Sequence, residues 1–277
     1  MNESKTHLAF VSEEAGKGYT YAIKKTESIV QTFAVCMLER LHAGSEAVKL
    51  LFEQYVAVHR KFDYSIGILM RSMLLDYMIL LNTFDIIHTY EEDPPKMEEL
   101  LNHFCLTMLS DSAYHALKYF KANVDIIPAE KLKGMYSMLV YLHQECFESY
   151  AHDGTEPVLK IKKMISQAQM VNRLKKSTHL SHLSRKEDWY MYYSKYDHFG
   201  KMYHGLSKRP LPDEFSNMGL AIRELPRSLA LMLTLLAIVF PTDAIIIAQF
   251  EKAKLYAEAL RKKEDAEIDA LINKKAN

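Results

Sequence analysis

The chain has few of the residues that end a helix and few that build a disulfide framework. Its 277 residues include 9 glycines, 8 prolines and 3 cysteines. Cys36, Cys105 and Cys146 are odd in number and form no Cys-x-x-Cys pair, which argues against a disulfide scaffold and against a zinc site. A reducing compartment is the simplest interpretation.

Net charge and membrane-spanning runs are also lacking. Basic and acidic residues number 35 each, so the chain as a whole is not a polybasic nucleic-acid binder. The first residues lack the basic start and apolar run of a signal peptide. Leu229–Phe240 is shorter than the roughly 18–20 residues that cross a bilayer, and we predict a buried core helix there, with Pro241 ending it and Asp243 capping the next. We expect a cytoplasmic protein that does not enter a membrane.

Helical spacing of apolar residues is present almost throughout. The residues from Ile66 to Ile87 repeat at three and four positions, and no alternating strand pattern is convincing. The sequence therefore predicts an all-α fold, a multi-helix bundle of about nine helices. The predicted helices cover residues 20–41, 45–62, 64–90, 95–122, 128–152, 157–176, 185–206, 214–240 and 242–274. The predicted organisation is an N-terminal helical segment at 1–44, a bundle core with the candidate site at 45–248, and a charged C-terminal helix at 249–277.

The predicted helix at 64–90 is apolar nearly all round, so it belongs at the centre of the bundle. Arg71, Asp76, Asn82 and Asp85 interrupt it. A buried charge needs a partner or a cleft, because burying it alone costs several kcal/mol. Asp76 is badly placed on the helix to pair with Arg71, so Arg71 is expected either to meet a structural partner on another helix or to hold a phosphate.

Acidic residues are absent between residues 160 and 186, where positive charge is concentrated. The basic side chains are Lys160, Lys162, Lys163, Arg173, Lys175, Lys176, Arg185 and Lys186. Such a segment suits RNA, and it equally suits a solvated helix that docks an acidic protein partner or pairs with acidic residues of the chain. The candidate nucleic-acid contacts are Arg173, Lys175, Lys176, Arg185 and Lys186.

The only tryptophan and several tyrosines follow at Trp189–His204. On a helix, Trp189 and Tyr193 belong to an aromatic stripe, while Ser194 and His198 lie on the opposite side. The stripe is interpreted as core in preference to a stacking platform.

Histidine spacing does not support a metal site. His-x-x-His occurs at His179 and His182 and Glu-x-x-His at Glu39 and His42, but a di-iron bundle needs two Glu-x-x-His elements and two more glutamates. The sequence also lacks a glycine-rich phosphate loop and a nucleophile elbow. We therefore predict no metal and no cofactor.

Two short motifs carry a family resemblance. Leu69-Met-Arg-Ser-Met-Leu-Leu-Asp76 and Tyr193-Ser-Lys-Tyr-Asp-His198 resemble motifs of uncharacterised bacterial all-helical proteins that are related in outline to the HEPN superfamily. The resemblance covers roughly residues 50–240. It implies a bundle in which Arg71, Ser194 and His198 approach one another. It also implies metal-independent RNA cleavage, often at a dimer interface, in toxin or phage-defence systems.

Two functions follow as hypotheses. In the first, the protein binds RNA or another phosphate-bearing ligand, with catalytic candidates His198, Arg71, Ser194, Tyr193 and Asp76, and with a homodimer as an expected assembly. His198 would be the general acid or base, and Arg71 or Arg173 would stabilise the pentavalent phosphate. In the second, these groups form a buried polar network of a non-catalytic interaction protein.

Overall fold

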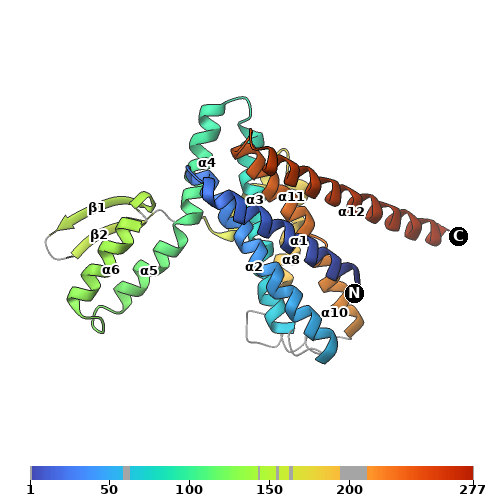
Figure 1. The fold of residues 1–277 in the computed structure, drawn as a ribbon, viewed down its shortest axis with the longest axis horizontal. Coiled ribbons are helices and arrows are strands. Elements are labelled where there is room, and N and C mark those ends of the chain that lie inside the picture. Colours follow the sequence, from blue (N-terminus) through green and yellow to red (C-terminus); the bar gives the residue numbers. More distant parts are fainter. Residues whose placement is uncertain are drawn as a thin grey trace. The chain divides into compact units, whose positions relative to one another are not determined.

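The computed structural model describes residues 2–58, 63–142, 144–153, 156–161, 165–193 and 211–276, and helices dominate it (Figure 1). Its α-helices are α1 (Asn2–Ala22), α2 (Ile29–Val58), α3 (Asp63–Thr89), α4 (Pro94–Leu109), α5 (Asp111–Ala122), α6 (Ala129–Leu142), α7 (Gln167–Lys176), α8 (Glu187–Tyr193), α10 (Leu211–Ile222), α11 (Leu225–Val239) and α12 (Ala244–Ala276). Short 3-10 turns are η1 (Ile23–Lys25), η2 (Gln144–Cys146) and η3 (Ser181–Lys186). The predicted all-α bundle is confirmed.

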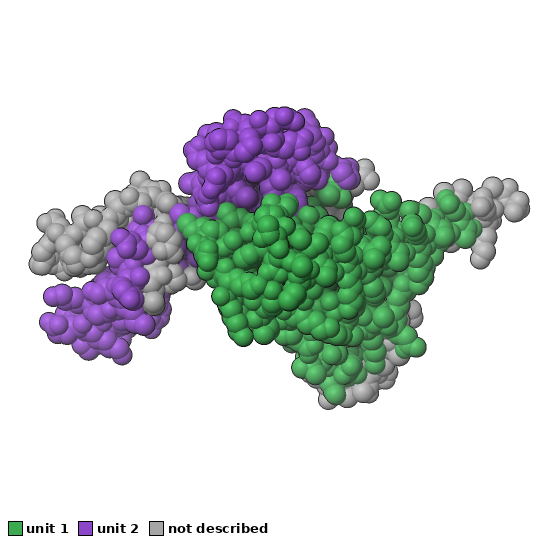
Figure 2. All heavy atoms as spheres, turned by 45° about the horizontal axis from the view of Figure 1, so that its top comes forward, with its two compact units in different colours: residues 1–81, 183–277 green, residues 82–182 purple. Residues whose placement is uncertain are grey.

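The chain forms two compact units (Figure 2). Unit 1 contains residues 1–81 and 183–277, and unit 2 contains residues 82–182. Helix α3 contributes its first part to unit 1 and its last turns to unit 2.

Unit 1 is a helical bundle in which α1 packs along α2, and α11 packs against α1, α2 and α12. Leu8 and Val11 of α1 and Leu229 and Leu233 of α11 are completely buried. In the apolar run at Leu229–Phe240, the buried residues are Leu229, Met232, Leu233, Leu235 and Leu236, whereas Ile238 is 42% exposed, so the predicted burial is confirmed for the first part of the run. In Figure 1, α12 begins beside α11 and ends at the C-terminus.

Several predicted helix boundaries in unit 1 are wrong, and the single helix predicted at 214–240 is two helices, α10 and α11. The first predicted helix begins at about residue 20, whereas α1 already occupies Asn2–Ala22. A break was predicted at residues 42–44, whereas α2 is continuous from Ile29 to Val58. Gly44 lies inside α2, close to α3. A Cβ at this position would lie 2.9 Å from the sulfur of Met73 on α3. This glycine permits close helix packing and does not end a helix.

Other predicted helix ends are confirmed. The Asp93 side chain accepts a bond from the Lys96 amide at 3.2 Å and caps α4, which opens with Pro94. The Asp243 carboxylate accepts from the amides of Ile245 and Ile246 at 3.1 and 3.3 Å and caps α12. These caps satisfy amides that have no partner inside their helices.

Unit 2 contains the β-strands of the described part of the chain. Strands β1 (Phe147–Asp153) and β2 (Glu156–Ile161) pair antiparallel, with Tyr150 opposite Leu159 and a register shift between Phe147 and Ser149. The sequence predicted helices at 128–152 and 157–176, so both were placed too broadly. Helix α6 ends at Leu142, and β1 extends to Asp153, one of the residues at which a helix break was predicted.

One helix of the described part of the chain is long and apolar enough to cross a membrane, over residues 65–89. It belongs to α3, and 72% of its apolar window is buried inside the protein. This helix is therefore largely buried, as predicted for a helix at the centre of the bundle.

Candidate functional site

Arg71 of α3 contacts α8, the helix that leads into the second predicted motif. The Tyr190 hydroxyl accepts bonds from Arg71 Nη2 at 3.0 Å and Nε at 3.3 Å, and the guanidinium carbon lies 5.3 Å from the centre of the tyrosine ring. Tyr190 is buried and Arg71 is half-buried. The expected partner of Arg71 on another helix is therefore present, and it includes an aromatic hydroxyl.

The neighbouring residues of α8 were also candidates. Tyr193 is fully buried, which fits the interpretation of the aromatic stripe as core. Its ring meets that of Tyr192 edge-on, with centroids 5.0 Å apart. Ser194 and His198 lie outside the described residues.

Asp76, one turn and a half after Arg71, is bound by an arginine that the sequence reasoning missed. Arg40 of α2 donates from Nε to Oδ2 at 2.9 Å and from Nη2 to Oδ1 at 3.0 Å, and Nη2 lies 3.2 Å from the Ser72 hydroxyl. Burial raises the pKa of Asp76, while Arg40 opposes that rise. Asp76 is thus a buried structural partner, as its position on an apolar helix required.

Unit 2 repeats this arrangement with other residues. Arg173 of α7 donates from Nε to Asp85 Oδ2 at 3.0 Å, and the Asp85 carboxylate is buried. Lys175 and Lys176 are exposed on the same helix. Arg185 and Lys186 belong to η3, but their side chains lie outside the described ones. Arg173 is therefore committed to an internal ion pair, whereas the two lysines face solvent.

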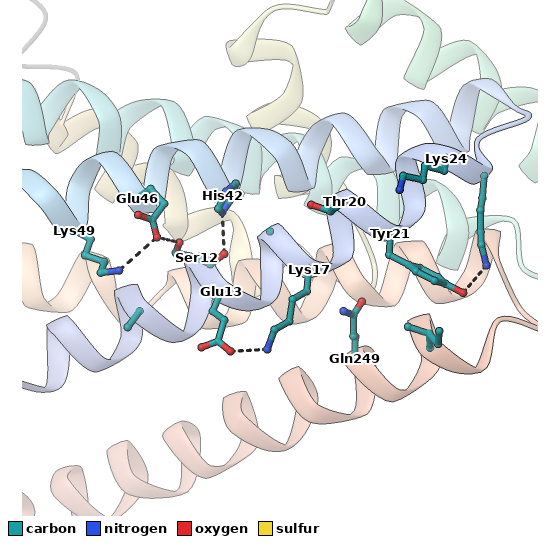
Figure 3. Close-up of a pocket in the computed structure, with 14 residues that line it drawn as sticks. Ser12, Glu13, Lys17, Thr20, Tyr21, Lys24, His42, Glu46, Lys49 and Gln249 are labelled. Atoms are coloured by element: carbon teal, nitrogen blue, oxygen red, sulfur yellow. Dashed lines mark hydrogen bonds and ion pairs between the residues drawn. The ribbon is translucent and has the colours of Figure 1, made fainter.

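Unit 1 has a groove along α1, here called the α1 groove (Figure 3). It has a volume of about 1100 Å³. The lining residues are Ala9, Ser12, Glu13, Gly16, Lys17, Thr20, Tyr21, Lys24, Lys25, His42, Glu46, Lys49, Ile245 and Gln249. They come from α1 and η1 at helical spacing, from α2 and from the start of α12. The sequence reasoning did not find this groove, because it is assembled from segments more than two hundred residues apart.

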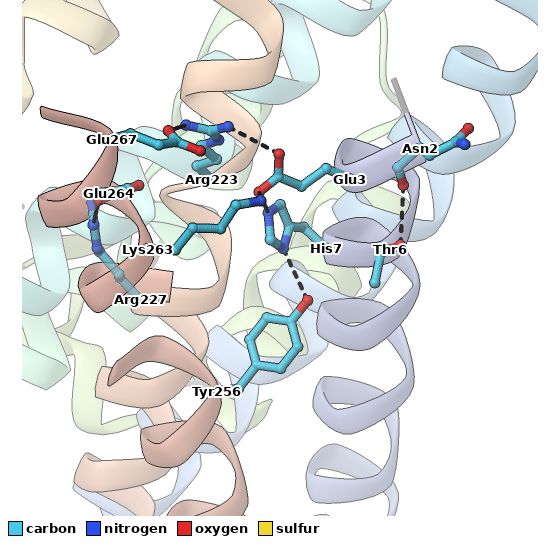
Figure 4. Close-up of polar contacts among 10 residues, drawn as sticks. All are labelled: Asn2, Glu3, Thr6, His7, Arg223, Arg227, Tyr256, Lys263, Glu264 and Glu267. Carbon is cyan, nitrogen blue, oxygen red and sulfur yellow. Dashed lines mark hydrogen bonds and ion pairs between the residues drawn. The ribbon is translucent and has the colours of Figure 1, made fainter. Parts of the chain in front are cut away.

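A second polar cluster joins α1 to the helices at the other end of the chain (Figure 4). Glu3 accepts bonds from Lys263 at 2.8 Å and Arg223 at 2.9 Å, and Arg223 also donates to Glu267 at 3.3 Å. The hydrogen bond from Lys263 is the largest of the effects that hold the pKa of Glu3 at about 2. These contacts fasten α12 to α1 and to the end of α10.

His7 lies one turn after Glu3 in the same cluster. Its Nδ1 lies 2.9 Å from the Tyr256 hydroxyl, and its Nε2 lies 3.6 Å from a Glu3 oxygen. Burial lowers the pKa of His7, and nearby Glu3 opposes this in part. The folded protein therefore favours the neutral imidazole.

Metal-ligand geometry does not appear in the described segments: no three of their His, Cys, Asp or Glu residues are grouped so that they could hold an ion. His88 and His179 approach with ring centroids 5.8 Å apart, but His182 does not complete a set with them.

The chain matches no protein-family model, no curated protein and no solved structure. Its function must therefore be argued from its own residues and their geometry.

Proposed function

We propose that this chain is a HEPN-like helical protein that binds RNA. The observation that carries the proposal is the contact between Arg71 and Tyr190, which are 119 positions apart in the sequence. Arg71 Nη2 lies 3.0 Å from the Tyr190 hydroxyl. Tyr190 stands four positions before Ser194, so the contact joins the helix of the first motif to the helix that leads into the second. The resemblance implies such an approach of the two motifs.

The catalytic form of the proposal is a metal-independent ribonuclease of a cytoplasmic toxin or phage-defence system that acts as a homodimer. His198 would transfer the proton at the 2′-hydroxyl or at the leaving oxygen, and Ser194 would orient it. Arg71 would be the phosphate ligand in preference to Arg173, because Arg71 contacts the helix that leads into the second motif, whereas Arg173 pairs with Asp85 in unit 2. Asp76 and Tyr193 would support the site through packing, since both are buried.

A cleavage assay with His198→Ala tests the catalytic form. We expect wild-type protein to cleave single-stranded RNA without added metal, and His198→Ala to lose a factor of about 10²–10⁴ in rate. The unfolding temperature, measured on the same preparations, should differ little between the wild type and the variant. His103→Ala is the matched control, because His103 is exposed on α4. Absence of cleavage by the wild type across the pH range, or equal loss in both variants, would contradict the catalytic form.

RNA binding is tested separately from cleavage through α7. Replacing Lys175 and Lys176 by Glu should weaken binding and reduce the slope of log affinity against log salt by about 0.7 per lost phosphate contact for a single strand. The control replaces Lys118 and Lys121 of α5, two exposed lysines one turn apart in the same unit. An unchanged slope in the α7 variant would remove α7 from the RNA surface.

A second candidate function, a non-catalytic interaction protein, is favoured by the two internal ion pairs. Asp76 with Arg40 and Asp85 with Arg173 use charged groups to join helices. In that case the exposed lysines of α7 dock an acidic protein partner. No RNA binding even at low salt, together with capture of an acidic peptide that the α7 variant abolishes, would favour this candidate.

A further inference from the structure

The α1 groove contains two carboxylates that are already neutralised. Glu46 accepts a hydrogen bond from the Ser12 hydroxyl, and Lys49 lies 3.5 Å from the same carboxylate. Glu13 lies 2.5 Å from Lys17. The hydrogen bond from Ser12 lowers the pKa of Glu46, and the bond from Lys17 lowers that of Glu13. Three of the four lysines that line the groove pair with carboxylates, whereas Lys24 has no ion pair among the described residues.

The imidazole of His42 is held in one orientation at the wall of this groove. Its Nδ1 lies 2.9 Å from the Ser12 backbone oxygen. A carbonyl oxygen can only accept, so Nδ1 carries the proton and Nε2 of the neutral ring is an acceptor. The ring packs on Gly16, where a Cβ would lie 2.9 Å from it. The glycine is needed at this position to admit the ring.

Next to His42, the groove has a row of polar groups with unused bonding capacity. Thr20 lies one turn after Gly16 on α1, about 6 Å further along the helix, and Lys24 lies on η1, which follows α1. Both are exposed, and neither has a hydrogen bond or ion pair within the described part of the protein. Figure 3 shows Thr20 between His42 and Lys24.

Gln249 faces the row from α12 (Figure 3). Its amide oxygen is buried without a hydrogen-bond partner among the described residues and lies 3.5 Å from where a Cβ on Gly18 would be. This oxygen is closed off from solvent, so Gln249 contributes to the wall of the groove and does not offer its oxygen to a ligand.

The groove offers little to a flat aromatic ligand. Its one lining phenol ring, Tyr21, is covered by the Lys25 ammonium group at 4.1 Å from the ring centre. The Tyr21 hydroxyl and Lys25 both bond to Asp243. A nucleobase would therefore find no free ring of this kind to stack on.

We propose that the α1 groove binds a small phosphate ester that carries hydroxyl groups, of the sugar phosphate class. Lys24 binds the phosphate, Thr20 bonds to the ester or a neighbouring hydroxyl, and His42 Nε2 accepts a bond from a sugar hydroxyl. Gln249 closes the opposite side. The volume of about 1100 Å³ accommodates such a ligand with solvent around it. This site does not depend on the RNA proposal, because none of its residues belongs to the two motifs.

Calorimetric titration of the full chain with glucose 6-phosphate tests the proposal. We expect saturable binding that is at least tenfold tighter than that of inorganic phosphate, glucose or adenosine 5′-monophosphate. No binding of glucose 6-phosphate at millimolar concentration would overturn the proposal. Equal affinity for inorganic phosphate would overturn the role of the hydroxyl groups, and tighter binding of the nucleotide would overturn the ligand class.

Variants assign the binding to the groove. Lys24→Ala should weaken it by about tenfold or more, since it removes a charge-assisted bond, and Thr20→Val by a smaller factor. Lys262→Ala is the matched control, an exposed lysine of α12 outside the groove. His42→Asn keeps a donor near the position of Nδ1 but removes the acceptor Nε2, so it tests the bond proposed between Nε2 and a sugar hydroxyl. Unfolding temperatures confirm that each variant is folded, and equal affinities in Lys24→Ala and Lys262→Ala would overturn the assignment.

Discussion

Unit 1 and unit 2 are both helical, but they differ in how they treat large apolar side chains. Unit 1 buries Phe52 and Leu38 almost completely within a bundle of long helices. In unit 2, Tyr141 is 85% exposed and Ile126 78% exposed around the short helices α5 and α6. Burial of apolar area is the main stabilising term, so these buried side chains of unit 1 should contribute more to stability than the exposed ones of unit 2, although Leu50 and Leu255 of unit 1 are exposed as well.

Each unit contains an ion pair between a buried aspartate of α3 and an arginine. Helix α3 contributes Asp76 to unit 1 and Asp85 to unit 2, and each pairs with an arginine of another helix. Asp76 receives two bonds from Arg40, one on each oxygen. Asp85 receives one from Arg173, and its Oδ1 is buried without a hydrogen-bond partner in the described region. Both carboxylate oxygens of Asp76 are thus hydrogen-bonded by its arginine, whereas only one oxygen of Asp85 is.

The largest expected effect tests the difference in burial. Leu38→Ala in unit 1 should lower the free energy of unfolding by about 2–5 kcal/mol, because Leu38 is fully buried and a cavity remains. Ile126→Ala in unit 2 should change it by less than about 0.5 kcal/mol. Urea denaturation followed by circular dichroism measures both. A comparable loss in the two variants would show that Ile126 is covered in solution.

The next effect compares the two aspartates. Asp76→Asn should lower the free energy of unfolding by about 1–3 kcal/mol. The amide nitrogen of the new asparagine would face a guanidinium donor, where Asp76 has an accepting oxygen. Asp85→Asn should cost about 1 kcal/mol less, because the amide oxygen can keep the single bond to Arg173. Both are measured by chemical denaturation. A larger loss at Asp85 would reverse our ranking of the two pairs.

Part of this arrangement follows from sequence. The continuous apolar pattern identified α3 as a central helix, and the cost of burying charge required partners for Asp76 and Asp85. Asp243 was predicted as a cap because Asp follows Pro241 at the end of an apolar run. These inferences depend on local spacing and on the solvation of single groups, which one sequence contains.

Other parts depend on contacts between distant segments. Gly44 resembles a helix break in sequence, and only the presence of Met73 against it explains a continuous α2. Arg40 had no local feature that distinguished it as the partner of Asp76. The α1 groove combines Thr20, His42 and Gln249, whose proximity is set by tertiary packing. A glycine inside a helical pattern, such as Gly16, was the one available signal of a close approach.

The two units should also differ in their response to mild acid. Burial lowers the pKa of His7 below 6.5, so the unfolded chain binds this proton more readily than the folded one. The resulting stability is complete above pH 6.5 and decreases as pH falls below it, by at most about 1.4 kcal/mol per pH unit. His7→Gln should flatten this dependence between pH 7 and 5. His103→Gln, at an exposed histidine of unit 2, should leave it unchanged.

The smallest effect concerns Glu3, whose carboxylate fastens α12 to α1 in unit 1 (Figure 4). Its side chain is 33% exposed, so Glu3→Gln should cost no more than about 1 kcal/mol at neutral pH, and less at high salt. The pKa of Glu3 is lowered from 4.5 to about 2, so the folded protein binds this proton less readily than the unfolded chain. The contribution is therefore complete above pH 4.5 and disappears as pH falls toward 2.

Glu99→Gln in unit 2 is the control, because Glu99 is exposed and pairs with Lys96 one turn away on the same helix. Denaturation curves from pH 7 to pH 2 should show a difference between Glu3→Gln and wild type that shrinks with acid, whereas the Glu99→Gln curves should follow the wild type throughout. A constant difference across that range would mean that the Glu3 contacts do not fasten the two helices in solution.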